Sequence, residues 1–292
     1  MNHGRRGRRA IDAGDDDVLT IRNPELGLID LARYPIDRLD SQAGTDLIKR
    51  CHQSLENDAL CALPGFIRAE AIETLRKEVE PLLNDVVWHD DQFGFAYDDW
   101  EDDDFPPGHP RRRRFRSLYK RVLNYAIPNN ALLRRLYLSN ILIEFVRRVF
   151  GAASMYPSQC PHLSLTLKVE DEGDTDAWHY DSNDGVVSLL LQQPDTGGEF
   201  EYAPYIRSEQ NECYDQVAAM LDNPGALAKR PLMAPGTFVF FNGKLSLHRV
   251  RPVGRTAKPR VIGLLSYDRR PDYVSEQPYI KYLSTLPRKP LR

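Results

Sequence analysis

Apolar positions follow a helical spacing in the first half of the chain and a strand spacing in the second. Residues 43–55 and 69–83 repeat apolar side chains at helical intervals, which predicts two helices. A short apolar run at 59–67 predicts a strand between them. The apolar residues within 129–150 predict a third helix, and Gly151 ends it, as glycine commonly does at a helix C-terminus.

Beyond residue 160 the pattern indicates strands. Residues 162–169 alternate apolar and polar side chains, as a half-buried strand does. Apolar and aromatic runs predict four more strands, at 186–191, 199–202, 237–241 and 260–267. A helical insertion is predicted near 209–221. Helices followed by closely spaced strands are typical of an α+β fold with a mostly β core, a sandwich or barrel supported by helices.

Changes in charge along the chain predict its organisation. Residues 1–16 hold an arginine cluster followed by acidic residues, which predicts a flexible N-terminal extension. Residues 17–292 are expected to form a single domain. Within it, 88–116 is acidic and aromatic at first and arginine-rich at its end, which predicts a long loop acting as a lid.

Composition narrows the class of protein. The 292 residues carry a net charge of −3 and are 41% hydrophobic, which excludes a nucleic-acid binder defined by bulk basicity and predicts a well-packed core. No apolar run reaches the roughly eighteen residues of a membrane span, and no apolar stretch follows the basic start as in a secretory signal. The four cysteines show no CxxC pair, which favours reduced thiols and a cytoplasmic location.

Two histidines stand two positions before a carboxylate, His89 before Asp91 and His179 before Asp181. Seven histidines and 42 acidic residues predict about one such triplet by chance, so the spacing alone carries little weight. The first triplet lies in the acidic segment, where a chance match is easy. The second lies between predicted strands, and residues i and i+2 of a strand point to one face. His179 and Asp181 are therefore candidate metal ligands.

One histidine and one carboxylate make two thirds of the 2-His-1-carboxylate triad, which leaves open positions on Fe(II). His248 is the candidate third ligand because it follows the strand predicted at 237–241. Arg260 opens the last predicted strand, and a buried arginine can bind the distal carboxylate of 2-oxoglutarate through two parallel hydrogen bonds. Each residue alone is as easily a core histidine or a surface cation. The four together, in this order, indicate a metal site with a co-substrate.

The motifs around these residues resemble the iron(II)/2-oxoglutarate dioxygenases, and more narrowly the branch of free-amino-acid radical halogenases and their hydroxylase relatives. The likeness covers about 59–268 and is carried by Trp178-His-Tyr-Asp181, Val187-Ser-Leu-Leu-Leu-Gln192, Gly197-Gly-Glu-Phe-Glu-Tyr202 and Ser246-Leu-His-Arg-Val250 through Asp268. The resemblance implies a double-stranded β-helix (jelly roll, cupin-like) core with flanking helices. It also implies catalysis with Fe(II), 2-oxoglutarate and O2, with His179, Asp181 and His248 on the metal and Arg260 on the co-substrate.

The halogenases of this branch carry glycine where this chain has Asp181, which frees a place on iron for chloride. The resemblance therefore implies an oxygenase that hydroxylates an unactivated C–H bond of a free amino acid or amino-acid-derived small molecule, in natural-product biosynthesis. Radical cyclisation to a cyclopropane or aziridine, desaturation, and a peptidyl substrate remain alternatives. Outside these enzymes, the alternatives are a catalytically inactive jelly-roll binding module and a nucleic-acid binder using 5–9 and 111–116, which the acidic stretch 98–104 disfavours.

The resemblance also suggests candidate substrate-binding residues. This branch draws a carboxylate-binding arginine from the region before the core, so Arg113, Arg114 and Arg116 are candidates. Lysine-acting members have an acidic residue directly after the triad carboxylate position; here Ser182 stands there, with Asp184 nearby, which disfavours plain lysine as substrate. The expected partner is a small amino-acid-like molecule, with neither nucleic acid nor membrane. The oligomeric state is left open, a homodimer being one alternative.

Overall fold

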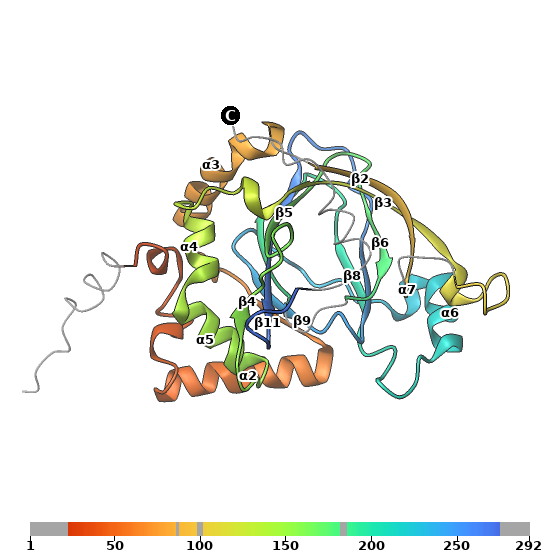
Figure 1. The fold of residues 1–292 in the computed structure, drawn as a ribbon, viewed down its shortest axis with the longest axis horizontal. Coiled ribbons are helices and arrows are strands. Elements are labelled where there is room, and N and C mark those ends of the chain that lie inside the picture. Colours follow the sequence, from red (N-terminus) through yellow and green to blue (C-terminus); the bar gives the residue numbers. More distant parts are fainter. Residues whose placement is uncertain (1–22, 86–87, 98–101, 182–185, 275–292) are drawn as a thin grey trace, which may run out of the picture.

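The computed structural model describes residues 23–85, 88–97, 102–181 and 186–274 (Figure 1). The predicted extension at 1–16 lies outside these residues. Among the described residues, two antiparallel sheets carry the fold. The large sheet has the order β1-β9-β7-β11-β5-β3-β2, with β4 paired to β11, and the small sheet has the order β6-β10-β8.

The strand bounds agree with most of the predicted positions and add β2, β3, β4, β6 and β10. The large sheet contains β1 (Leu60–Leu63), β2 (Trp88–Phe95), β3 (Arg114–Val122), β4 (Tyr156–Pro157), β5 (Leu165–Glu170), β7 (Val186–Gln192), β9 (Phe238–Phe241) and β11 (Arg260–Asp268). The small sheet contains β6 (Asp176–His179), β8 (Phe200–Ala203) and β10 (Leu247–Val250).

Strand β5 shows why the large sheet has two different faces. Alternate side chains of a strand point to opposite faces, and Leu165, Leu167 and Val169 enter the hydrophobic core. The intervening residues are equally buried but polar, and they lie on the opposite face: Thr166, Lys168 and Glu170. Buried polar side chains are retained where they find partners, which makes this inner face a candidate location for a functional site.

Four helices cover the outer face of the large sheet (Figure 1). They are α2 (Gln42–Asp58), α3 (Ala69–Asp85), α4 (Leu132–Leu138) and α5 (Asn140–Val149). Ser41 caps α2, its hydroxyl accepting a hydrogen bond from the Gly44 N–H at 3.1 Å. The single helix predicted at 129–150 is wrong in one respect: Ser139 has an extended backbone and divides it into α4 and α5.

The segment 88–116 is not a continuous loop, which corrects the prediction. Its two ends are β2 and β3, which pair antiparallel from Trp88 opposite Arg121 to Phe95 opposite Arg114. The high charge that suggested a loop is matched across the strands, because the Arg116 guanidinium donates to both Asp91 carboxylate oxygens at 2.9 and 3.0 Å. Opposite charges on neighbouring strands stabilise a sheet. Only residues between these strands remain as a connection.

The predicted insertion between β8 and β9 contains α6 (Tyr214–Asp222) and α7 (Pro224–Leu227). In Figure 1 these helices lie beyond the small sheet, beside the far end of β2 and β3. Arg113 joins the two regions, because its guanidinium donates to the Asp222 carboxylate at 2.6 Å. None of the helices in the part of the chain that the structure describes is long and apolar enough to cross a membrane.

Candidate metal centre

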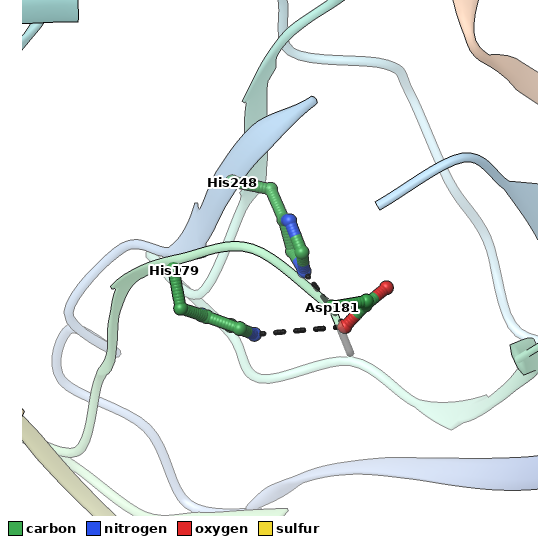
Figure 2. A group of neighbouring side chains, drawn as sticks. All are labelled: His179, Asp181 and His248. Atoms are coloured by element: carbon green, nitrogen blue, oxygen red, sulfur yellow. Dashed lines mark ion pairs between the residues drawn. The ribbon is translucent and has the colours of Figure 1, made fainter. Parts of the chain in front are cut away.

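His179, Asp181 and His248 converge on one point (Figure 2). His179 ends β6 and His248 lies on β10, and the antiparallel pairing of these strands sets the two histidines directly opposite each other. The Asp181 Oδ1 atom lies 3.5 Å from the Nε2 atom of His248 and 4.0 Å from that of His179. The donor atoms of all three residues lie within 4.8 Å of one another.

Backbone carbonyls orient both imidazole rings. The Nδ1 atom of His179 lies 2.7 Å from the Ala177 oxygen, and that of His248 lies 3.0 Å from the Ser246 oxygen. A carbonyl only accepts hydrogen bonds, so each Nδ1 carries the proton and each Nε2 faces the site as a potential ligand. Two imidazole nitrogens and one carboxylate oxygen on one side are the donor set that non-haem Fe(II) takes. The residues therefore fit this metal.

Asp181 is placed by the loop between β9 and β10. Strand β6 ends at His179, so the predicted strand face does not extend to Asp181. Instead, the Asp181 N–H donates to the Gly243 carbonyl at 3.1 Å. A Cβ atom on Gly243 would lie 1.9 Å from the Asp181 Oδ2 atom. Gly243 is thus required for the carboxylate to reach its position.

The pKa shifts of Asp181 and His179 favour the unprotonated forms that bind a metal. Burial raises the pKa of Asp181, but His248 and His179 together outweigh burial, so the net pKa is below its usual value. Burial and the neighbouring His248 lower the pKa of His179. Burial lowers the pKa of His248, but the Asp181 carboxylate, the Ser246 carbonyl and the Asp176 carboxylate together outweigh burial, and the net pKa is raised. At His248 a proton therefore competes with a metal ion for the Nε2 atom, and metal binding releases that proton.

The three ligands line a cavity of about 600 Å³ between the two sheets, and Arg260 lines the same cavity. Arg260 opens β11, where it stands opposite Glu170 on β5, and its Nη1 atom donates to the buried Glu170 carboxylate at 2.5 Å. Gly198 has a φ of +69°, and a Cβ there would lie 3.2 Å from the Arg260 Cδ atom. The absence of a side chain at Gly198 thus leaves space for Arg260.

Other charged side chains on the cavity wall were not predicted. Lys168 pairs with Asp176 and Arg207 with Glu212, the latter at 3.0 Å. Burial would raise the pKa of Asp176, but the Lys168 ammonium, and after it His179, lower it below its usual value. Strand parity contained part of this information, because Lys168 alternates with Leu167 and Val169 on the strand predicted at 162–169. The partners from other strands had no local pattern.

The arginines predicted to bind a substrate carboxylate do not line the cavity. Arg114 and Arg116 project from the opposite face of β3 to Ser117, Tyr119 and Arg121, which do line it. Arg116 contacts Asp91, and Arg113 contacts Asp222. The structure gives no support to the assignment of these three arginines. Ser182 and Asp184, the other two candidates, lie outside the described residues.

The chain matches one protein-family model over most of its length. The family model Halogenase D (HalD) matches residues 43–279. No curated protein matches the chain in sequence.

Solved structures share the fold. The α-ketoglutarate-dependent epimerase SnoN from nogalamycin biosynthesis is 13% identical, with coverage of 85% of this chain and 91% of its own and a TM-score of 0.55. The carbocyclase SnoK from the same biosynthesis is 15% identical, with coverage of 84% and 93% and a TM-score of 0.52. HygX from Streptomyces hygroscopicus, solved with nickel, 2-oxoglutarate and hygromycin B, is 14% identical, with coverage of 78% and 89% and a TM-score of 0.51.

The two packed antiparallel sheets and these neighbours confirm the predicted jelly-roll core with flanking helices. The family match, together with the His–Asp–His donor set, confirms the predicted enzyme class and its use of Fe(II) and 2-oxoglutarate. The chain belongs to the halogenase D family, among the 2-oxoglutarate-dependent non-haem iron enzymes.

Proposed function

We propose that the protein hydroxylates an unactivated C–H bond of a free amino acid or an amino-acid-derived small molecule. In this reaction substrate, O2 and 2-oxoglutarate give the hydroxylated product, succinate and CO2. The bound Fe(II) supplies the oxidation of the C–H bond, and the protein holds the metal and positions the substrate. The observation that carries the proposal is the carboxylate of Asp181 within the ligand set, 3.5 Å from the His248 nitrogen.

Asp181 favours hydroxylation over halogenation, although the family takes its name from halogenases. The resemblance found in the sequence implies that halogenases of this branch carry glycine at this position, which leaves a place on iron for chloride. In this chain the Asp181 carboxylate lies beside both imidazole Nε2 atoms. A carboxylate ligand there occupies the place that a halide would need.

The cavity supports a small, charged substrate. Its volume of about 600 Å³ lies within the range of small-molecule sites. The cavity must hold 2-oxoglutarate as well as the substrate, so the substrate is small. Charges of both signs line it, including Lys168 with Asp176 and Arg260, which suits a molecule carrying an ammonium and a carboxylate. Tyr97, from the connection after β2, also lines the cavity and supports the covering role proposed for that segment. The nogalamycin origin of SnoN and SnoK is consistent with a role in natural-product biosynthesis.

Arg260 is proposed to bind the distal carboxylate of 2-oxoglutarate. A guanidinium has five N–H donors, so its contact with Glu170 leaves donors for a ligand. Arg260→Lys keeps a cation beside Glu170 but loses the fork that holds a carboxylate at two points. Hydrogen bonds to charged groups contribute about 1.5–3 kcal/mol, so the KM for 2-oxoglutarate should rise roughly 10–100-fold. At saturating 2-oxoglutarate, kcat should change little.

Steady-state succinate formation against 2-oxoglutarate concentration measures this effect. Arg251→Lys is the matched control, because Arg251 is a half-exposed residue that lies 4.0 Å from Glu199 and does not line the cavity. An unchanged KM in Arg260→Lys would contradict the assignment of Arg260.

Product analysis tests the proposed reaction. The protein is incubated with Fe(II), 2-oxoglutarate, chloride and ¹⁸O2 and a panel of amino acids and their derivatives, and products are identified by mass spectrometry. We expect succinate and a product that gains one labelled oxygen atom to form in equal amounts. A product lighter by two hydrogens would instead show cyclisation or desaturation, and a chlorinated product would show halogenation. Metal binding without succinate across the panel would favour an inactive binding module.

A further inference from the structure

A second carboxylate lies beside the three ligands. The Asp176 Oδ2 atom is 3.9 Å from the His179 Nε2 atom, which is close to the 4.0 Å between that nitrogen and the Asp181 Oδ1 atom. Asp176 is buried at the start of β6 and lines the same cavity. It is nevertheless not a member of the group whose donor atoms all lie within 4.8 Å of one another.

Two side chains from the large sheet engage both Asp176 oxygens. The Lys168 ammonium on β5 donates to Oδ2, and the Ser117 hydroxyl on β3 donates to Oδ1 at 3.3 Å. Lys168 is itself held, because its ammonium lies 4.0 Å from the centre of the Tyr119 ring. Its side chain and that of Asp176 are almost fully buried, at 8% and 10% exposure. The contacts therefore draw the carboxylate toward the large sheet.

A free carboxylate so near a divalent ion would compete for a coordination position. The facial triad works because three protein ligands leave the remaining positions for co-substrate and O2. Asp176 bound to the metal would make a fourth protein ligand and remove one of those positions. A buried carboxylate that loses its cation is left uncompensated unless it gains another cation or a proton, and a metal ion held by His179, 3.9 Å from Asp176, would supply that cation.

We propose that Lys168 is a positioning residue: its ammonium holds the Asp176 carboxylate away from the metal, so that the site keeps three protein ligands. This role rests on the metal site of the proposed function but not on the identity of the substrate. Lys168 and Asp176 together then set the number of protein ligands on the metal.

Replacing Lys168 by methionine tests this role. The variant keeps the length of the side chain and removes the ammonium, so Asp176 gains access to the metal. Co(II) affinity measured by calorimetry without 2-oxoglutarate should tighten roughly tenfold or more, within the range known for groups around a metal site. Binding of 2-oxoglutarate to the Co(II) protein should weaken at the same time. Co(II) visible absorption should also change, because it reports the ligand set directly.

The matched variant is Lys168→Met with Asp176→Asn, which removes both buried charges and keeps the volume of the pair. Its Co(II) affinity and its 2-oxoglutarate binding should return to within a few-fold of wild type. Lys168→Arg, which keeps the cation, should also stay near wild type. Circular dichroism and thermal unfolding confirm that each variant is folded.

A folded Lys168→Met protein that binds Co(II) as weakly as wild type, or more weakly, would overturn the proposal. So would a double variant that behaves like the single one, because the effect would then not act through Asp176. If Lys168→Met does not fold, the double variant Lys168→Met with Asp176→Asn provides the test. Co(II) or 2-oxoglutarate binding by this double variant that differs from wild type by more than a few-fold would then overturn the proposal. Wild-type protein that binds no divalent cation would overturn the proposed function itself, which is a different result.

Discussion

Asp181→Ala should reduce succinate formation to background. The substitution removes the only carboxylate in the cluster of three donors found among the described residues. Losing a direct ligand should cost more than the roughly 10–100-fold that changes around a metal site cost. Turnover and metal affinity should therefore fall together.

Thermal unfolding separates this loss from a loss of folding. A ligand at 100 times its Kd stabilises a protein by about 2.7 kcal/mol, so Ni(II) should raise the Tm of wild type but not of Asp181→Ala. Asp46→Ala is the matched control, because Asp46 is exposed on α2. Retained succinate formation in folded Asp181→Ala would show that Asp181 is not a ligand.

Gly243→Ala should damage the same site without touching a ligand. The added Cβ would lie 1.9 Å from the Oδ2 atom and 2.5 Å from the Cγ atom of Asp181. Atoms cannot approach so closely, so the carboxylate or the loop must move, and the Asp181 N–H bond to the Gly243 carbonyl holds the two together. We expect metal affinity to fall roughly 10–100-fold, with turnover at limiting Fe(II) falling in parallel.

Calorimetric titration with Co(II) measures the expected change. Gly225→Ala is the control, because a Cβ there meets its nearest atom at 3.8 Å and α7 contributes nothing to the cavity. Overpacking costs about 1–3 kcal/mol of stability, so the titration is made well below the Tm of the variant. Metal affinity equal to wild type would show that the loop yields and that Gly243 does not position Asp181.

The core strands and the three clustered candidate ligands could be predicted from the sequence because both have local patterns. Strands β5 and β11 alternate or run apolar over several residues, and His179 and His248 stand beside such strands. The spacing of His179 and Asp181 suggested one strand face, whereas the structure uses a strand end and a separate loop. The sequence contains no local pattern that pairs Gly243 with Asp181, because their contact depends on the path of the chain.

Charge was the main source of error. The acidic and basic runs of 88–116 resemble a solvated loop, but Asp91 and Arg116 pair across two strands. The same strand parity that turns Arg114 and Arg116 away from the cavity turns Arg121 toward it. Arg121, and not Arg113, Arg114 or Arg116, therefore lines the cavity. The buried pair of Lys168 and Asp176 joins two strands whose contact only the fold reveals.

The central claim is that His179, Asp181 and His248 hold Fe(II) with 2-oxoglutarate bound beside it. Visible absorption of the metal-free protein, titrated anaerobically with Fe(II) and then with 2-oxoglutarate, tests it most directly. Chelation of 2-oxoglutarate to Fe(II) should produce a weak charge-transfer band in the green part of the spectrum. The band should be absent in His179→Ala. Folded wild-type protein that shows no band at saturating Fe(II) and 2-oxoglutarate would contradict the account.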